Sequence, residues 1–332
     1  MRKLTIDEAA ARLASLERVV ILFHARPDGD AIGSAFALRR VLALRGCRAA
    51  CVCAHELPAR LRFLAALDED AQTSVLAAVL PEDLADAPVV SVDTAAPAQA
   101  GELAEAFLPR CVLMIDHHAS GTPYADYCID PAASATGELL CALLRRLCPD
   151  GLDPVAAAML FAAIATDTGC FKYSNATAAT HRAAADLLDA GIGRIIDPAE
   201  LTRRLFDVKT AQTLRAEQLA LANLRRFAGG RVVISTLTHA EREAANLRAE
   251  DTETMIDAIR VVEGCEIAAI VKQIEDGPTG PRYRASLRST GPNVAEIAEK
   301  FGGGGHARAA GCTIAAPDLQ AAIQALLEGI GD

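Results

Sequence analysis

Short apolar runs, each followed at once by acidic or histidine side chains, constrain the fold of this chain most. Three such runs, at residues 19–23, 89–92 and 111–115, lie in the first part of the sequence. Apolar strands separated by helical stretches are typical of a parallel sheet that is covered on both faces. Open α/β sheets bind ligands at the carboxyl ends of their strands. The pattern therefore predicts an α/β domain with a polar site at that edge.

The pattern changes along the chain, which predicts two domains of different size. Residues 210–227 are expected to form one long helix, followed by Gly229 and Gly230. Strands and helices then start again, with a predicted antiparallel hairpin across residues 276–278. The expected fold class is α/β: a parallel-sheet domain (residues 1–190), a helical linker (191–229) and a smaller α/β domain (230–332).

The composition indicates a globular protein that does not enter a membrane. Hydrophobic residues make up 52% of the chain, which excludes a disordered chain. The longest apolar run, residues 155–165, is far shorter than the roughly 20 residues that span a bilayer. The N-terminus lacks the apolar stretch of a signal peptide, so we expect a soluble, cytoplasmic protein. The net charge of -10 argues against stable complexes with long nucleic acids, because such binding relies on a basic surface.

Candidate metal ligands follow the first two of these strands. His24, Asp28 and Asp30 come directly after residues 19–23, at the edge where ligands bind. A turn with a helix cap is the plain alternative, because Asp-Gly turns are common. Asp93 follows the next strand, and taken alone it could be only a helix cap.

The triplet Asp116-His117-His118 is the most unusual of these groups. It comes directly after the apolar strand at residues 111–115. Three consecutive polar residues at the end of such a strand are costly unless they are used or solvated. Asp167 lies at the end of the apolar stretch 155–165, where the helix dipole disfavours a carboxylate and a nearby cation would remove the penalty.

These groups are expected to converge, because three of the four follow strands that share one sheet edge. Together they contribute four carboxylates and at least two imidazoles: Asp28, Asp30, Asp93, Asp167, His24 and His117. Carboxylates packed together repel one another unless cations balance them. Two divalent cations would do so, and this ligand set suits manganese, with magnesium, cobalt, iron or zinc as weaker candidates.

The same motifs resemble those of the DHH phosphoesterase superfamily, which is named for the triplet that is Asp116-His117-His118 here. Residues 24–34, Asp93 and residues 166–169 resemble its other motifs. The run of glycines from Gly302 to His306 is similar to the signature of the DHHA1 domain, the usual partner of a DHH domain. The resemblance covers nearly the whole chain. Its nearest subgroup is that of the bifunctional oligoribonucleases and pAp (3′-phosphoadenosine 5′-phosphate) phosphatases.

The resemblance implies separate roles for the site residues. It implies two divalent metal ions, with Mn²⁺ expected first and Mg²⁺ or Co²⁺ as alternatives, held by His24, Asp28, Asp30, Asp93, His117 and Asp167. Asp93 would bridge the two ions, Asp116 would orient a ligand, and His118 would face the substrate phosphate, which makes Asp116 and His118 the implied catalytic residues. The implied substrate-binding residues are Arg288, Gly303, Gly304, Gly305 and His306.

The function implied is that of a hydrolase in which two metal ions activate water for attack on phosphorus. It would cleave short oligoribonucleotides to 5′-mononucleotides and pAp to AMP, with short RNA, dinucleotides or pAp as substrates. Two alternatives stay open: a phosphodiesterase for cyclic di-AMP or pApA, and a non-catalytic nucleotide-binding sensor. A sensor would tolerate the loss of metal ligands, and none is missing. The oligomeric state stays open, a homodimer included.

Overall fold

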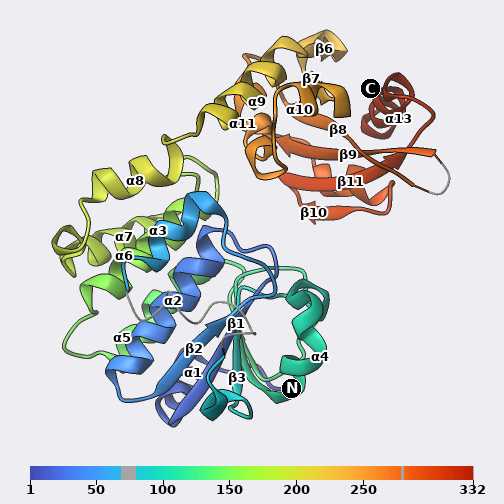
Figure 1. Cartoon of the computed structure of the whole chain (residues 1–332). Coiled ribbons are helices and arrows are strands. Elements are labelled where there is room, and N and C mark those ends of the chain that lie inside the picture. The colour runs from blue at the N-terminus through green and yellow to red at the C-terminus, as the bar shows by residue number, and fades with distance from the viewer. Residues whose placement is uncertain (69–79, 278–279, 332) are drawn as a thin grey trace. The chain divides into compact units, whose positions relative to one another are not determined.

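Two compact units, Met1–Val208 and Lys209–Asp332, make up the chain. The computed structural model describes residues 1–68, 80–277 and 280–331 (Figure 1). Within these ranges no helix combines the length and the apolar character needed to span a bilayer.

A parallel sheet of five strands forms the centre of the N-terminal unit, in the order β2-β1-β3-β4-β5. The strands are β1 (Arg18–Phe23), β2 (Arg48–Val52), β3 (Val89–Val92), β4 (Cys111–Asp116) and β5 (Tyr127–Ile129). β1 and β3 are almost entirely buried, as expected where helices cover both faces of a sheet. The predicted parallel-sheet domain is thus confirmed.

The helices of this unit divide between the two faces of the sheet. They are α1 (Ile6–Ala14), α2 (Gly29–Leu44), α3 (Arg62–Ala65), α4 (Ala104–Phe107), α5 (Thr136–Leu147), α6 (Pro154–Asp167), α7 (Ala178–Asp189) and α8 (Pro198–Phe206). The core on one face includes residues of α1, α2, α5 and α6, and the core on the other face includes residues of α4. α6 is apolar on all sides and is buried throughout from residue 155 to residue 165, as a helix without a polar face must be.

A mixed sheet of six strands forms the C-terminal unit, in the order β10-β11-β9-β8-β7-β6. The strands are β6 (Arg225–Phe227), β7 (Val232–Leu237), β8 (Ile267–Gly277), β9 (Gly280–Ser289), β10 (Gly304–His306) and β11 (Ala309–Ala315). Only β7 and β8 are parallel among the described pairs. The helices are α9 (Ala211–Ala222), α10 (His239–Ala244), α11 (Met255–Ile259), α12 (Val294–Glu299) and α13 (Leu319–Ile330). The predicted second α/β domain is confirmed.

The structure corrects the prediction of one long helix at residues 210–227. α9 ends at Ala222, and Arg225–Phe227 pairs with β7 as the edge strand β6. The side chain of Asn223 donates hydrogen bonds to the Thr236 carbonyl (3.1 Å) and to Glu241 (2.7 Å), which fix the chain where the helix stops. β8 and β9 form the predicted hairpin, while Pro278 and Thr279 of its turn lie outside the described residues.

Candidate metal centre

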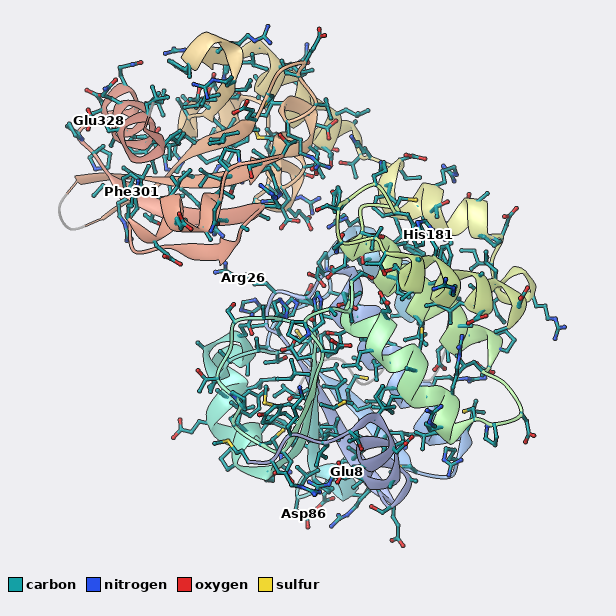
Figure 2. The ribbon with its side chains drawn as sticks, turned by 180° about the vertical axis from the view of Figure 1, so that it is seen from behind. Glu8, Arg26, Asp86, His181, Phe301 and Glu328 are labelled. Carbon is teal, nitrogen blue, oxygen red and sulfur yellow. The ribbon has the colours of Figure 1, made fainter. Side chains whose placement is uncertain are left out.

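The carboxyl ends of β1, β3 and β4 place three of the predicted groups at one edge of the sheet. Phe23 pairs with Val92, and Val92 pairs with Ile115, so the residues that follow these strands are neighbours. Figure 2 shows Arg26, on the loop after β1, at one end of the N-terminal unit, and Asp86, which precedes β3, at the other end. The predicted convergence at the carboxyl edge therefore occurs in the folded chain.

His24, Asp28 and Asp93 form the first group of candidate ligands. The Nε2 atom of His24 lies 3.4 Å from Oδ2 of Asp93 and 3.7 Å from Oδ1 of Asp28. One ligand atom from each residue lies within 4.8 Å of the others, close enough to hold one ion. Asp28 also caps α2, because its Oδ1 accepts a hydrogen bond from the amide of Ala31 (3.0 Å). The helix cap that the alternative predicted is therefore present, and the same carboxylate also lies within the candidate ligand group.

Asp30, His117 and Asp167 form the second group, which also meets the 4.8 Å limit. Nε2 of His117 lies 3.2 Å from Oδ2 of Asp167, 3.8 Å from Oδ2 of Asp30 and 3.9 Å from Oδ1 of Asp93. The carboxylate of Asp93 therefore lies between the two groups, with one oxygen near His24 and the other near His117. This is the position that a bridging ligand requires.

The two histidines of the triplet have different partners. Nδ1 of His117 is 3.2 Å from the carbonyl oxygen of Ala133, so this nitrogen carries the proton and Nε2 is left to bind an ion. Nδ1 of His118 instead lies 2.7 Å from Oδ1 of Asp116, which also accepts the amides of His117 and His118. Asp116 thus fixes His118, whereas a backbone carbonyl fixes the predicted metal ligand. A cavity of about 210 Å³ borders Asp116 and His118.

The acidic side chains are buried to an extent that calls for cations. Asp30 is fully buried and Asp93 is 2% exposed. Burial, together with the charges of Asp93 and Asp167, raises the pKa of Asp30 well above its usual value. Burial also raises the pKa of Asp167 to about 6, although a hydrogen bond with His117 opposes it. A divalent cation would relieve this repulsion, and oxygen and imidazole ligands are those that manganese accepts, so the residues fit divalent metal ions.

The imidazoles carry the positive charge of the cluster in the absence of a metal. Burial alone would lower the pKa of His24, but hydrogen bonds with Asp28 and Asp93 outweigh burial and raise it to about 10. Burial also acts to lower the pKa of His117, and its carboxylate neighbours, with Asp167 first, raise it to about 10. Protons or metal ions therefore balance the negative charge of the carboxylates in this centre.

Sequence reasoning missed Thr136, which supports two of the carboxylates from the start of α5. Its amide donates to Oδ2 of Asp30 (2.7 Å), and its hydroxyl donates to Oδ1 of Asp93 (3.0 Å). The amide of Gly137 (2.9 Å) and the hydroxyl of Ser34 (3.0 Å) both donate to Oδ1 of Asp30. The sequence shows only a Thr-Gly pair at the start of a helix. The carboxylates that accept its hydrogen bonds lie 43 to 107 residues away in the sequence, so the pair does not reveal them.

Two backbone features also locate these ligands. Asp93 has a φ of 51°, in the left-handed region that aspartate enters more readily than most residues, and its amide donates to the carbonyl of Ile115 (3.0 Å). Gly137 allows α5 to approach α6, because a Cβ atom there would lie 2.5 Å from the Cβ of Ala163. The first feature positions Asp93, and the second allows the start of α5, which donates to Asp30, to lie close to α6.

The predicted substrate-binding residues lie in the C-terminal unit. Arg288, in β9, pairs with Ala309 of β11, and β11 pairs with the glycine-rich strand β10. The glycine run therefore includes a short strand, Gly304–His306. A Cβ on Gly303 would lie 2.3 Å from the carbonyl oxygen of Gly311, so the close approach of the two backbones explains that glycine. Gly304 and Gly305 are exposed, and the side chain of His306 lies outside the part of the chain that the structure describes.

Comparison with known proteins gives consistent matches over both units. The model of the DHH family, N-terminal domain, matches residues 18–192, and that of the DHHA1 domain matches residues 229–332. The chain is 33% identical over 315 residues to the bifunctional oligoribonuclease and PAP phosphatase NrnA of Thermus thermophilus, which covers 94% of this chain and 89% of the relative. The protein of the same name from Bacillus subtilis is 28% identical over 96% of each chain.

A solved structure supports the fold. An exopolyphosphatase-related protein from Bacteroides fragilis superposes with a TM-score of 0.85 at 22% identity, covering 98% of this chain and 95% of that one. At this level of identity, the similarity concerns the architecture of the two units only.

Proposed function

The chain belongs to the DHH family, and from this premise we propose that it hydrolyses short oligoribonucleotides to 5′-mononucleotides and pAp to AMP. The relatives named for both activities align along nearly the whole chain, through both units. The observation that carries the proposal is the carboxylate of Asp93, whose two oxygens lie near imidazoles of two separate ligand groups. The cytoplasm is the proposed location.

Two divalent cations complete the proposed centre, with Mn²⁺ preferred over Mg²⁺ or Co²⁺. His24 and Asp28 would hold one ion, and Asp30, His117 and Asp167 the other, with Asp93 shared between them. When bound, such ions acidify water and neutralise charge on a phosphoryl group.

Asp116 acts through His118 in this proposal. The carboxylate accepts the Nδ1 proton of His118 and so leaves Nε2 as the ring atom that can contact substrate. Burial acts to lower the pKa of His118, but the hydrogen bond with Asp116 raises it above its usual value. A protonated His118 can donate a hydrogen bond to a phosphate oxygen or a proton to the leaving oxygen. Asp116 is then a positioning residue.

The C-terminal unit supplies substrate recognition in this proposal. The guanidinium of Arg288 can bind a terminal phosphate through two hydrogen bonds. Gly304, Gly305 and His306 form β10, and Gly303 comes directly before it. β10 pairs with β11, which in turn pairs with the strand β9 that carries Arg288, and backbone groups of this glycine run can approach a nucleotide closely. Residues 191–229 are proposed to connect the unit that binds the metal ions to the unit that recognises the substrate. Short RNA and pAp both carry a terminal phosphate that such residues can bind.

A substrate panel tests the proposal. Purified protein with Mn²⁺ is assayed on pAp, pApA, RNA of two to ten nucleotides, cyclic di-AMP and pyrophosphate. We expect fastest turnover of the shortest RNAs and pAp, and no turnover after chelation of the metal. Faster cleavage of cyclic di-AMP would reassign the protein to the cyclic-dinucleotide phosphodiesterases. Tight nucleotide binding without turnover of any substrate would identify a sensor.

A further inference from the structure

Three basic side chains gather in the C-terminal unit, apart from the predicted substrate residues. Lys272 of β8 lies directly opposite Arg284 of β9, so their side chains are on the same face of the sheet. Arg242 lies on α10, which starts beside β8, since the amide of His239 donates to the side chain of Gln273 (3.2 Å). The three residues thus come from three neighbouring elements.

No carboxylate pairs with any of the three among the residues that the structure describes. The ammonium group of Lys272 donates to the hydroxyl of Thr252 (3.1 Å), and a side-chain nitrogen of Arg242 lies 3.4 Å from Nδ1 of His239. Burial first, and then the charge of Arg284 with a contribution from Arg242, lowers the pKa of Lys272, although Glu253 acts in the opposite direction. Like charges directly opposite one another destabilise a sheet. A bound anion would remove that cost.

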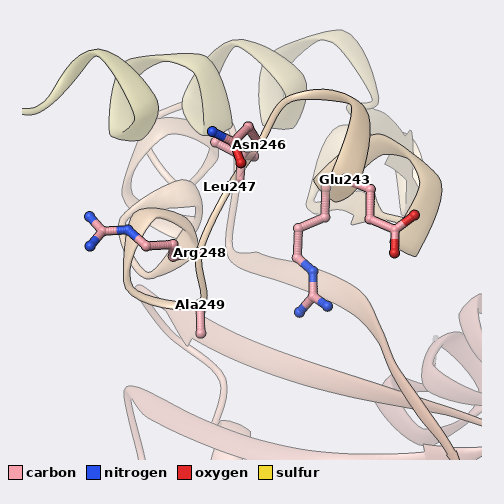
Figure 3. A pocket seen from close by; sticks show the side chains of 6 residues that line it. Glu243, Asn246, Leu247, Arg248 and Ala249 are labelled. Carbon is pink, nitrogen blue, oxygen red and sulfur yellow. The ribbon is translucent and has the colours of Figure 1, made fainter.

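A cavity of about 410 Å³ borders one member of this cluster. Arg242 lines it, and Figure 3 shows Asn246 and Arg248 on the loop that follows α10. Arg248 is already paired with Glu250 and Asp251, so it is not a free cation. The cavity gives a bound group access to Arg242 from solvent.

The cluster shares a sheet face with Arg288. Residues 284, 286 and 288 of β9 point to one side, and their partners on β11 are Thr313, Gly311 and Ala309. These partners are small and partly exposed, whereas the alternate residues Ala285 and Leu287 are buried on the other side. Arg284 and Arg288 are four residues apart, or roughly 13 Å along the strand. Two Cα atoms at that separation allow the guanidinium groups to hold different phosphates of one strand.

We propose that Arg242, Lys272 and Arg284 form a second phosphate-binding site, which holds a backbone phosphate of RNA beyond the nucleotide at Arg288. The inference rests on the proposed function and deepens it, because it names oligoribonucleotides of several residues as the substrates that gain affinity. A single nucleoside bisphosphate such as pAp is too short to reach both sites. The partly exposed β9–β11 surface between the two sites accommodates the intervening nucleotides.

The variant R284Q tests the proposal in the full-length protein. With a pentaribonucleotide we expect KM to rise about tenfold at unchanged kcat, the signature of lost uniform binding. KM for pAp should stay within about twofold of the wild type. The dependence of the logarithm of RNA affinity on the logarithm of salt concentration should become less steep by about 0.7. R284K should retain most of the affinity, and R215Q, which removes an exposed charge on α9, serves as the matched control.

Measuring RNA binding in the absence of catalysis tests this phosphate-binding site independently of the proposed hydrolytic function. A fluorescent pentaribonucleotide is titrated in a chelating buffer, where turnover cannot contribute. If the wild type cleaves nothing but binds RNA more tightly than R284Q and K272Q do, the proposed function is wrong and the site remains. Equal affinity losses in R284Q and R215Q, or an equal rise in KM for pAp, would overturn the site. Competition by tripolyphosphate as strong as that by RNA would identify a polyphosphate site instead.

Discussion

The two units concentrate opposite charges, and they do so in different ways. In the N-terminal unit, acidic side chains are buried and held by hydrogen bonds from Thr136, Gly137 and Ser34. In the C-terminal unit, Arg284 is exposed and makes no ion pair among the described residues. The first arrangement fixes the geometry in which cations would bind, and the second leaves the long, exposed side chain of Arg284 able to follow a polyanion. We therefore expect changes in the N-terminal unit to affect rate, and changes in the C-terminal unit to affect affinity.

Asp93→Asn would test the first half of this comparison most severely. The substitution keeps the shape of the side chain but removes the charge shared by both ligand groups, so kcat should fall by at least about a thousandfold. The steady-state rate with pAp and with a dinucleotide measures the effect. Glu105→Gln, which removes an exposed carboxylate from α4, should match the wild type. Retention of more than a tenth of the activity would show that Asp93 is not a shared ligand.

Thr136→Val tests whether Thr136 supports the metal ligands without binding a metal ion itself. The valine keeps the volume and the backbone amide but loses the hydroxyl that donates to Asp93, so metal affinity should fall by about 10- to 100-fold. A titration of activity against Mn²⁺ measures the shift, and saturating metal should restore most of kcat. Thr136→Ser retains the donor and should behave like the wild type. A loss of kcat that no metal concentration restores would contradict a supporting role.

The pH dependence of metal binding tests the charge balance of the centre. The raised pKa values of His24 and His117, each about 10, keep both imidazoles protonated at neutral pH when no metal is bound. A metal ion must displace those protons, so its affinity should rise with pH, by about tenfold per pH unit for each proton released. Calorimetry in two buffers of different ionisation enthalpy counts the protons. Binding that releases none between pH 6 and pH 8 would show that protons do not occupy the cluster.

Arg288→Ala would sharpen the second half of the comparison. Loss of the guanidinium should raise KM for pAp and for short RNA by about tenfold, with kcat largely unchanged. The measurement is a full Michaelis–Menten analysis for both substrates and for pyrophosphate. Pyrophosphate carries no nucleoside, so its weak hydrolysis, where detectable, should be unaffected. An equal loss on pyrophosphate would argue against a recognition role for Arg288.

The strands and the convergence of polar groups were predictable from the sequence because both follow from local rules. A run of five apolar residues predicts a buried strand, and a parallel sheet brings the ends of its strands together. The positions of His24, Asp93 and His117 in the fold follow from those two statements.

Other parts depend on contacts that no local pattern encodes. The three residues of β6 form a strand only because β7 lies beside them, and the helix prediction for this segment was therefore wrong. Thr136 supports Asp30 and Asp93 across 106 and 43 residues of sequence. In the sequence, nothing distinguishes Arg284 from other solvated arginines. Only the pairing of β8 with β9 shows that it lies opposite Lys272.

The hydrogen bonds to Asp30 have a consequence for discrimination between ions of different radius. Both of its oxygens accept donors from rigid elements, the amides of Thr136 and Gly137 and the hydroxyl of Ser34, so the carboxylate cannot rotate or retreat. Calcium needs ligand distances of about 2.3–2.6 Å and more oxygens, whereas magnesium needs about 2.0–2.1 Å. A carboxylate held in this way favours the smaller ions and resists expansion around calcium.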